Sequence, residues 1–122
     1  MPACEIVGLP DASIKESKNR VRSAICGCGF TFPLARITIN LAPADIKKCG
    51  STYDLPIFLS ILKASNQITN SLEDSVFIGE LSLTGDIRPV HGIISMAMRA
   101  KKEGFKNMFV PYENAKEAAI IL

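Results

Sequence analysis

The sequence predicts an α+β fold, that is, a mixed α/β arrangement in a single domain. Segments in which polar and apolar residues alternate, typical of half-buried strands, lie between segments whose apolar residues recur at helical spacing. The chain has 122 residues, of which 48% are hydrophobic and 21% charged, a balance that suits one globular core and is short for two. We therefore expect residues 1–122 to fold as one domain.

The first half of the chain predicts two strands around one helix. Residues 4–8 form a short apolar strand that stops at Gly8-Leu9-Pro10. Asp11 and Ser13 both offer N-caps for a helix of about four turns, whose apolar stripe ends at Gly27-Cys28-Gly29. Residues 36–42 then alternate in polarity as a half-buried strand, and Pro43 closes it.

The second half predicts three helices and three strands. A broad apolar face over residues 54–64 indicates a central helix, in which Pro56 is tolerated because it lies in the first turn. Residues 76–90 suggest two strands around a turn at Thr84-Gly85-Asp86, with Pro89 ending the second strand. A helix over 93–103, a strand over 107–110 and a helix over 113–121 follow.

Composition narrows the class of protein. No apolar run reaches the ~18 residues of a membrane span, and the first residues lack the pattern of a signal peptide, so we expect a cytoplasmic protein. The four cysteines could in principle form disulfides or bind a metal. Cys26 and Cys28 are separated by one residue and the chain has one histidine, so reduced, partly buried thiols are the better interpretation, with no metal or cofactor site.

Positive charge is concentrated in the first half. Residues 1–50 carry seven lysines and arginines against four acidic residues, whereas residues 51–122 are slightly acidic. A mild basic face is expected there. Charge alone is too weak to identify a nucleic-acid binder, because such affinity grows with the number of phosphates neutralised.

The stretch KKCGSTYDLPIFLSILKAS, residues 47–65, raises the question of chemistry. A phosphate-binding loop needs a Lys-Ser/Thr pair after its glycines, but here the lysines precede the only glycine, so no nucleotide site is assigned. A nucleophilic Ser51 or Thr52 would need a base. The one histidine, His91, follows a proline turn and is interpreted as a loop residue, and Lys47 and Lys48 precede the hydroxyls too closely to fold back onto them. Capping of the following helix by these hydroxyls is the simpler interpretation.

Several motifs of the chain resemble a known family. IVGLPDASIKESKNRVRSAI (6–25), RITINLAPADIKKCGSTYDLPIFLSILKAS (36–65) and FIGELSLTGDIRPVHGIISMAMRAKKEGFKNMFVPYENAKEAAII (77–121) are similar to the N-terminal domain of the Mg-chelatase-like ATPases of the ComM/YifB family. The resemblance covers nearly the whole chain. It implies a fold like the proteolytic domain of Lon, a sheet packed with helices.

Lon-type peptidases use a Ser-Lys dyad, and the resemblance places Thr52 at the serine position and Ile94 at the lysine position. Because isoleucine cannot accept a proton, the comparison implies a degenerate site without catalytic residues. An active Ser/Thr peptidase of the Lon type is the less favoured alternative.

The family further implies a role within a larger protein. Full-length members resemble hexameric AAA+ ATPases that use ATP and Mg, and the ComM branch acts in DNA branch migration during natural transformation. The chain would then be a fragment that lacks both upstream strands and a downstream AAA+ module. The missing strands would leave a sheet edge open. Its partners would be that module, neighbouring subunits and single-stranded or branched DNA, with no membrane.

Two functions follow from this resemblance. The first is DNA binding and assembly by a non-catalytic domain, through a set of cations for each of which a solvated surface charge is the simpler interpretation: Lys15, Lys18, Arg22, Arg36, Lys47, Lys48 and Arg88. In the sequence no aromatic residue interleaves with them, so base stacking is not expected. The second is a protein-interaction or oligomerisation module that uses the turn over residues 85–92 and any open sheet edge.

Overall fold

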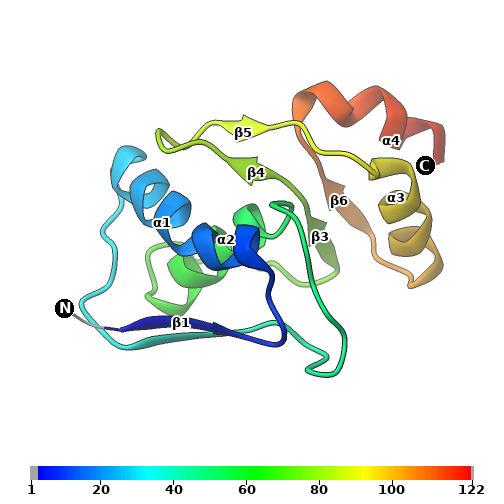
Figure 1. Ribbon diagram of the computed structural model, residues 1–122. Helices are drawn as coiled ribbons and strands as arrows, with labels where there is room; N and C mark the ends of the chain where they lie inside the picture. Colours follow the sequence, from blue (N-terminus) through cyan, green and yellow to red (C-terminus); the bar gives the residue numbers. More distant parts are fainter. Residues whose placement is uncertain (1–2, 122) are drawn as a thin grey trace.

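The computed structural model describes residues 3–121 and pairs their strands in three small sheets. Strand β1 (Cys4–Val7) lies parallel to β2 (Ile37–Asn40), and β3 (Ser75–Phe77) lies parallel to β6 (Asn107–Phe109). Strand β4 (Glu80–Leu81) pairs antiparallel with β5 (Ile87–Arg88). Figure 1 shows these sheets on different sides of the helices, so the predicted α+β class is confirmed with several small sheets.

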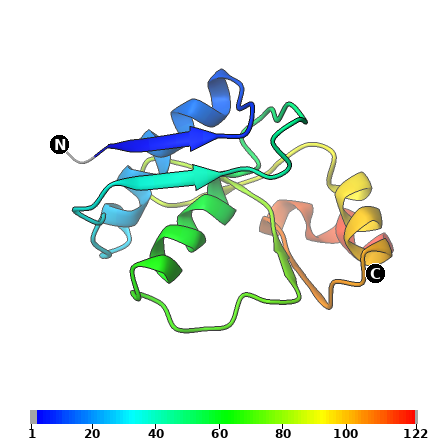
Figure 2. The same cartoon turned by 90° about the horizontal axis from the view of Figure 1, so that it is seen from below.

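Two helices form the core of the first half. Helix α1 (Ala12–Gly27) packs on α2 (Asp54–Ala64), and the β1–β2 sheet runs alongside them (Figure 2). Both helices were predicted from their apolar spacing, and both are found at those residues. Their buried cluster consists of Val21, Ala24, Ile25, Leu55, Ile57, Ile61, Leu62 and Leu81. Burial of such aliphatic side chains contributes ~1.5–3 kcal/mol each to folding.

The second half has its own apolar cluster. Helix α3 (Ile93–Lys102) and helix α4 (Ala115–Ile121), which follows a 3-10 turn (Tyr112–Asn114), lie beside the β3–β6 sheet. The cluster is made by Ile78, Val90, Ile93 and Ala118. The buried Asn114 side chain accepts a hydrogen bond from Val90 N at 2.9 Å and donates to Val90 O at 3.0 Å, which fixes the chain entering α3 to the turn before α4.

The first of the two strands predicted around the turn at Thr84-Gly85-Asp86 is in fact two strands, β3 and β4, with different partners. The chain leaves β6 at Ile78 and pairs with β5 from Glu80. Between them, Gly79 N donates to Thr52 O at 3.3 Å, and Gly79 O accepts from Leu55 N at 3.0 Å. A Cβ at position 79 would lie 2.9 Å from Ile87 Cγ2, so a larger residue at the break would force the Ile87 side chain to move. The alternation of polar and apolar residues in this segment does not predict that β3 and β4 pair with different strands.

The cysteines differ in part from the prediction. All four are free thiols, but only Cys4 is half-buried, and Cys26, Cys28 and Cys49 are exposed. Burial raises the pKa of the Cys4 thiol, although the charges of Lys18 and Arg22 oppose this effect. Within residues 3–121, none of the helices is both long and apolar enough to cross a bilayer.

Candidate functional site

The loop before α2 does not use its hydroxyls as the sequence predicted. The N-cap position of α2 is Tyr53, and no side chain caps the helix there. Ser51 contributes its carbonyl, which accepts from Asp54 N at 3.2 Å, and Thr52 contributes its carbonyl to Gly79. The prediction that Ser51 or Thr52 caps this helix is therefore wrong. Backbone carbonyls satisfy the start of α2 instead, since Asp54 N donates to Ser51 O and Leu55 N donates to Gly79 O.

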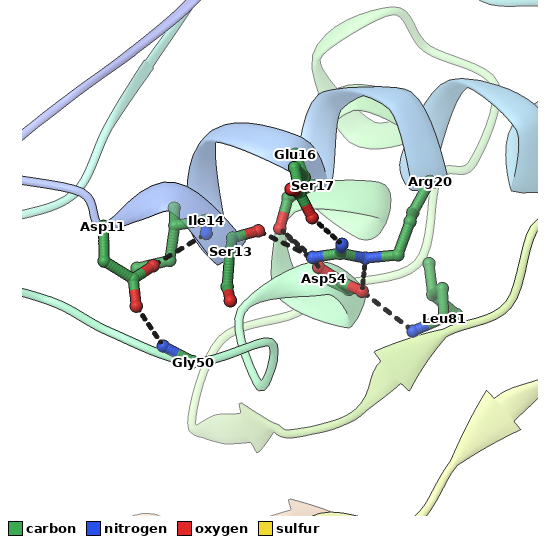
Figure 3. Close-up of polar contacts among 9 residues, drawn as sticks. All are labelled: Asp11, Ser13, Ile14, Glu16, Ser17, Arg20, Gly50, Asp54 and Leu81. Carbon is green, nitrogen blue, oxygen red and sulfur yellow. Dashed lines mark hydrogen bonds and ion pairs between the residues drawn. The ribbon is translucent and has the colours of Figure 1, made fainter.

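Asp54 is the centre of a buried polar cluster that sequence reasoning missed (Figure 3). Its carboxylate is fully buried. Oδ2 accepts from Arg20 Nε at 2.7 Å and from Leu81 N at 3.0 Å, and Oδ1 accepts from Arg20 Nη2 at 3.0 Å and from the Ser17 hydroxyl. Because every acceptor site is used, this carboxylate holds α1, α2 and β4 together and has no free lone pair for proton abstraction.

Arg20 is held in place from several sides. Its guanidinium also donates to Ser13 O at 2.8 Å and lies 3.5 Å from Glu16, one helical turn earlier. The hydrogen bond with Asp54 raises the pKa of Arg20 further above its ordinary value. The signal for this cluster was present in the sequence as Ser17 and Arg20 at a spacing of three, which puts them on one face of α1.

The two positions matched to the Lon dyad lie in different settings. Thr52 is half-buried, and within residues 3–121 no hydrogen bond to its hydroxyl is found. Ile94 lies in the first turn of α3, after Gly92 with φ of 81°, and its side chain is 41% exposed. A hydrocarbon at this position has no group that could accept the threonine proton.

Four of the predicted DNA contacts lie along the β1 side of α1. Lys15 and Lys18 are exposed and line a hollow of about 200 Å³ with Cys4, Glu5 and Ile6 of β1. Arg36 precedes Ile37, which is paired with Cys4, so it lies at the same end of the sheet. Arg22 is half-buried, and its guanidinium stacks on the Phe32 ring at 4.7 Å from the centroid. The expectation of no neighbouring aromatic residue is therefore corrected at this one position.

The other three predicted contacts are separate from that group. Lys47 is exposed near Asp11, whose pKa is lowered mainly by the N–H groups of Ile14 and Gly50 and to a lesser degree by this lysine. Arg88, on β5, lies 3.6 Å from Glu80 in an exposed ion pair, and Figure 1 places β5 on the far side of α1 from β1.

Lys48 is not an exposed cation. Its side chain is 5% exposed and its ammonium donates to the carbonyl of Pro43. The backbone explains this burial, because Lys48 N donates to Leu9 O at 2.9 Å and Lys48 O accepts from Asp11 N at 3.1 Å. The loop is thereby fastened to the turn before α1. The expectation that Lys48 is an exposed cation available to a partner is therefore corrected. Hydrogen bonds to residues far away in the sequence bury this side chain.

Comparison with known proteins identifies the class. Residues 1–114 match the family model of subunit ChlI of Mg-chelatase, so the chain belongs to this Mg-chelatase-like family. It is 50% identical over 122 residues to the YifB protein of Salmonella typhimurium. It is also 44% identical over 121 residues to the competence protein ComM of Haemophilus influenzae. The resemblance seen in the motifs is confirmed.

These relatives are much longer than the chain. The alignments cover 99% and 98% of the chain, but it spans only 24% of either relative, so it corresponds to their N-terminal part. Lon protease 1 of Hydrogenovibrio crunogenus is 32% identical over 85 residues, which is 70% of the chain and 10% of that protease. The similarity to Lon is therefore more distant.

Proposed function

We propose that the chain is the non-catalytic N-terminal domain of a cytoplasmic, hexameric Mg-chelatase-like ATPase, and that it binds DNA. The observation that carries the proposal is the row of cations beside β1. Lys15 and Lys18 are exposed on adjacent turns of α1, and Arg36 adds a third charge at the end of the sheet. ATP and Mg would be bound by a module outside these residues.

The row suits a phosphate backbone better than a base-reading site. Cations at helical spacings of three can follow successive phosphates, and such contacts give affinity without sequence preference. Glu5 lines the same hollow as Lys15 and Lys18, which moderates the local charge. The guanidinium of Arg22, which stacks on Phe32, offers a planar group on which a single-stranded base could stack.

The proposal that the domain is non-catalytic rests on Ile94. Without a lysine at this position the Thr52 hydroxyl keeps its proton at neutral pH, and loss of one member of a dyad costs orders of magnitude in rate. A casein-hydrolysis assay tests this directly. Turnover that disappears in Thr52→Ala would overturn the proposal in favour of a Lon-like peptidase.

DNA binding is tested by titrating labelled single-stranded and forked DNA at two salt concentrations. We expect salt-dependent binding that the double charge reversal Lys15→Glu/Lys18→Glu weakens by about tenfold or more, since both phosphate contacts are lost. Lys106→Glu/Lys116→Glu is the matched control, because it changes the net charge equally at exposed sites elsewhere. Equal losses in both double variants, or no salt-dependent binding, would reject the specific surface.

A second function, assembly, is favoured by the exposure of the turn after β5. Arg88, Pro89, His91 and Gly92 are all exposed, and Ile87 presents an apolar side chain beside them. Size measurements of the longer protein with and without residues 1–122 would test it. A smaller oligomer on deletion supports assembly, and an unchanged oligomer excludes it.

A further inference from the structure

The solvent side of α3 and α4 carries an apolar strip that neither the Asp54 cluster nor the basic row explains. Ile94 and Met98 are one turn apart on α3, and Met98 is 57% exposed. Ile120 of α4 is 77% exposed. Met98, Ile120 and Ile121 line one hollow of about 400 Å³ together with Lys101 and Lys102. We call the apolar residues Ile94, Met98, Ile120 and Ile121 the α3–α4 strip.

The strip has a positive border. Lys101 and Lys102 line the hollow, and no carboxylate does so among the described residues. Lys101 Nζ donates to Ile121 O at 3.1 Å, which leaves two of its three donors for a ligand. The nearby acid Glu103 is already occupied by Arg99, with Nε and Oε1 2.9 Å apart. Among residues 3–121, the two lysines therefore give the hollow a positive border.

We propose that the α3–α4 strip binds an amphipathic helix of a partner protein whose apolar face is aliphatic and whose flanks are acidic. Two packed helices with apolar side chains one turn apart present the ridges and groove into which a third helix fits. Aliphatic residues of the partner would cover Met98 and Ile120, and its Glu or Asp side chains would reach Lys101 and Lys102. This binding is independent of the DNA proposal, which uses the β1 side of α1.

Charge and side-chain type select this occupant over nucleic acid. Two lysines neutralise few phosphates, and Met98 and Ile120 provide no aromatic plane for a base. The exposed methionine is typical of surfaces that adapt to aliphatic helices. Ile94, which cannot act as a base, gains a role as the first apolar contact of the strip.

The experiment measures the fluorescence anisotropy of a labelled helical peptide built only from Glu and Leu at amphipathic spacing. We expect it to bind, and its affinity to fall about tenfold in Met98→Ser and in Lys102→Glu. Lys106→Glu is the matched control for charge, and its affinity should be unchanged because this exposed lysine does not line the hollow. Both positions are exposed, so the variants should fold, which circular dichroism verifies.

Three outcomes would overturn the proposal. The first is that the Glu/Leu peptide does not bind, and the second is that a Lys/Leu peptide of the same spacing binds equally well. The third is that Lys106→Glu weakens binding as much as Lys102→Glu, which would indicate diffuse attraction. A labelled oligonucleotide is titrated in parallel. If Lys102→Glu affects only the oligonucleotide, the strip contacts nucleic acid and the proposal fails.

Discussion

The Arg20 guanidinium holds the carboxylate of Asp54 through two hydrogen bonds, from Nε to Oδ2 at 2.7 Å and from Nη2 to Oδ1 at 3.0 Å. The two residues are 34 positions apart in the sequence and come from α1 and α2. The carboxylate is fully buried, so removing its partner groups exposes an uncompensated charge to a medium of low polarity.

Asp54→Ala is expected to destabilise the domain by about 3–5 kcal/mol, because Arg20, Ser17 and Leu81 N would all lose their acceptor. Urea unfolding followed by circular dichroism measures this loss. Glu103→Ala, which breaks the exposed pair with Arg99, is the control and should cost about 1 kcal/mol or less. If the two variants lose the same free energy, the buried pair does not have the role assigned to it.

A protein of this size has a stability of only ~5–15 kcal/mol, so Asp54→Ala could prevent folding altogether. Ser17→Ala then serves as the milder test. It removes one donor to Asp54 and should cost about 1–2 kcal/mol by the same measurement.

Asn114→Ala tests the hydrogen bonds between Asn114 and the backbone of Val90 in the second half of the chain. Its loss leaves the N–H and C=O of Val90 without partners in a buried site, and each unsatisfied group costs about 1–3 kcal/mol. We expect faster hydrogen exchange at the Val90 amide together with the loss of stability. Asn107→Ala, at an exposed position of β6, should change neither quantity by a comparable amount.

The helices could be predicted from the sequence because the information for them is local. The apolar stripe over 14–28 and the face over 54–64 specify α1 and α2, and both are found there. The break at Gly79 and the burial of Lys48 depend instead on hydrogen bonds to residues far along the chain, which no local pattern contains.

The same reason explains the outcome at the candidate site. Ser51 and Thr52 have the residue types of N-caps, but the first N–H groups of α2 donate to the backbone carbonyls of Ser51 and Gly79. The Asp54 carboxylate binds Arg20 of α1 instead. A carboxylate in a first helical turn reads as a favourable charge, and only the packing of α1 on α2 reveals that it is buried and paired. The cations at Lys15, Lys18 and Arg22 were foreseeable as a group because helical spacing alone places them.

Gly8→Ala should be far more costly than an ordinary glycine substitution. Gly8 has φ of 109°, and a Cβ there would lie 2.1 Å from the carbonyl oxygen of Leu41. Gly104 is the matched control, because its φ is 83° but nothing lies within 4 Å of the added carbon. Gly104→Ala should lose about 1 kcal/mol from backbone strain alone.

The difference in unfolding free energy between Gly8→Ala and Gly104→Ala isolates the clash with the Leu41 carbonyl. Since Leu41 N donates to Val7 O at 2.9 Å, the clash displaces the end of the β1–β2 sheet as well. We expect Gly8→Ala to lose at least about 2 kcal/mol more than Gly104→Ala in urea unfolding. Similar losses would mean that the turn at Gly8 relaxes easily.

Asp11 should make the domain more stable at a pH above the pKa of its carboxyl than at a pH below it. Hydrogen bonds from Ile14 N at 2.8 Å and Gly50 N at 3.0 Å lower the pKa of the Asp11 carboxyl from its ordinary value of 3.8. A group with a lowered pKa in the folded state stabilises that state at any pH above 3.8, and the contribution is lost as the pH falls through the lower, folded value.

Asp11→Asn tests this sign directly. The amide oxygen can still cap α1 at Ile14, but the variant loses the charge and the second oxygen that accepts from Gly50. In urea unfolding at a series of pH values, the wild-type protein should exceed Asp11→Asn in stability near neutral pH, and this excess should shrink steadily below pH 3.8. Asp45→Asn, at an exposed position, controls for the general effect of removing one negative charge. An excess that stays constant into strong acid would show that the Asp11 charge is not coupled to folding.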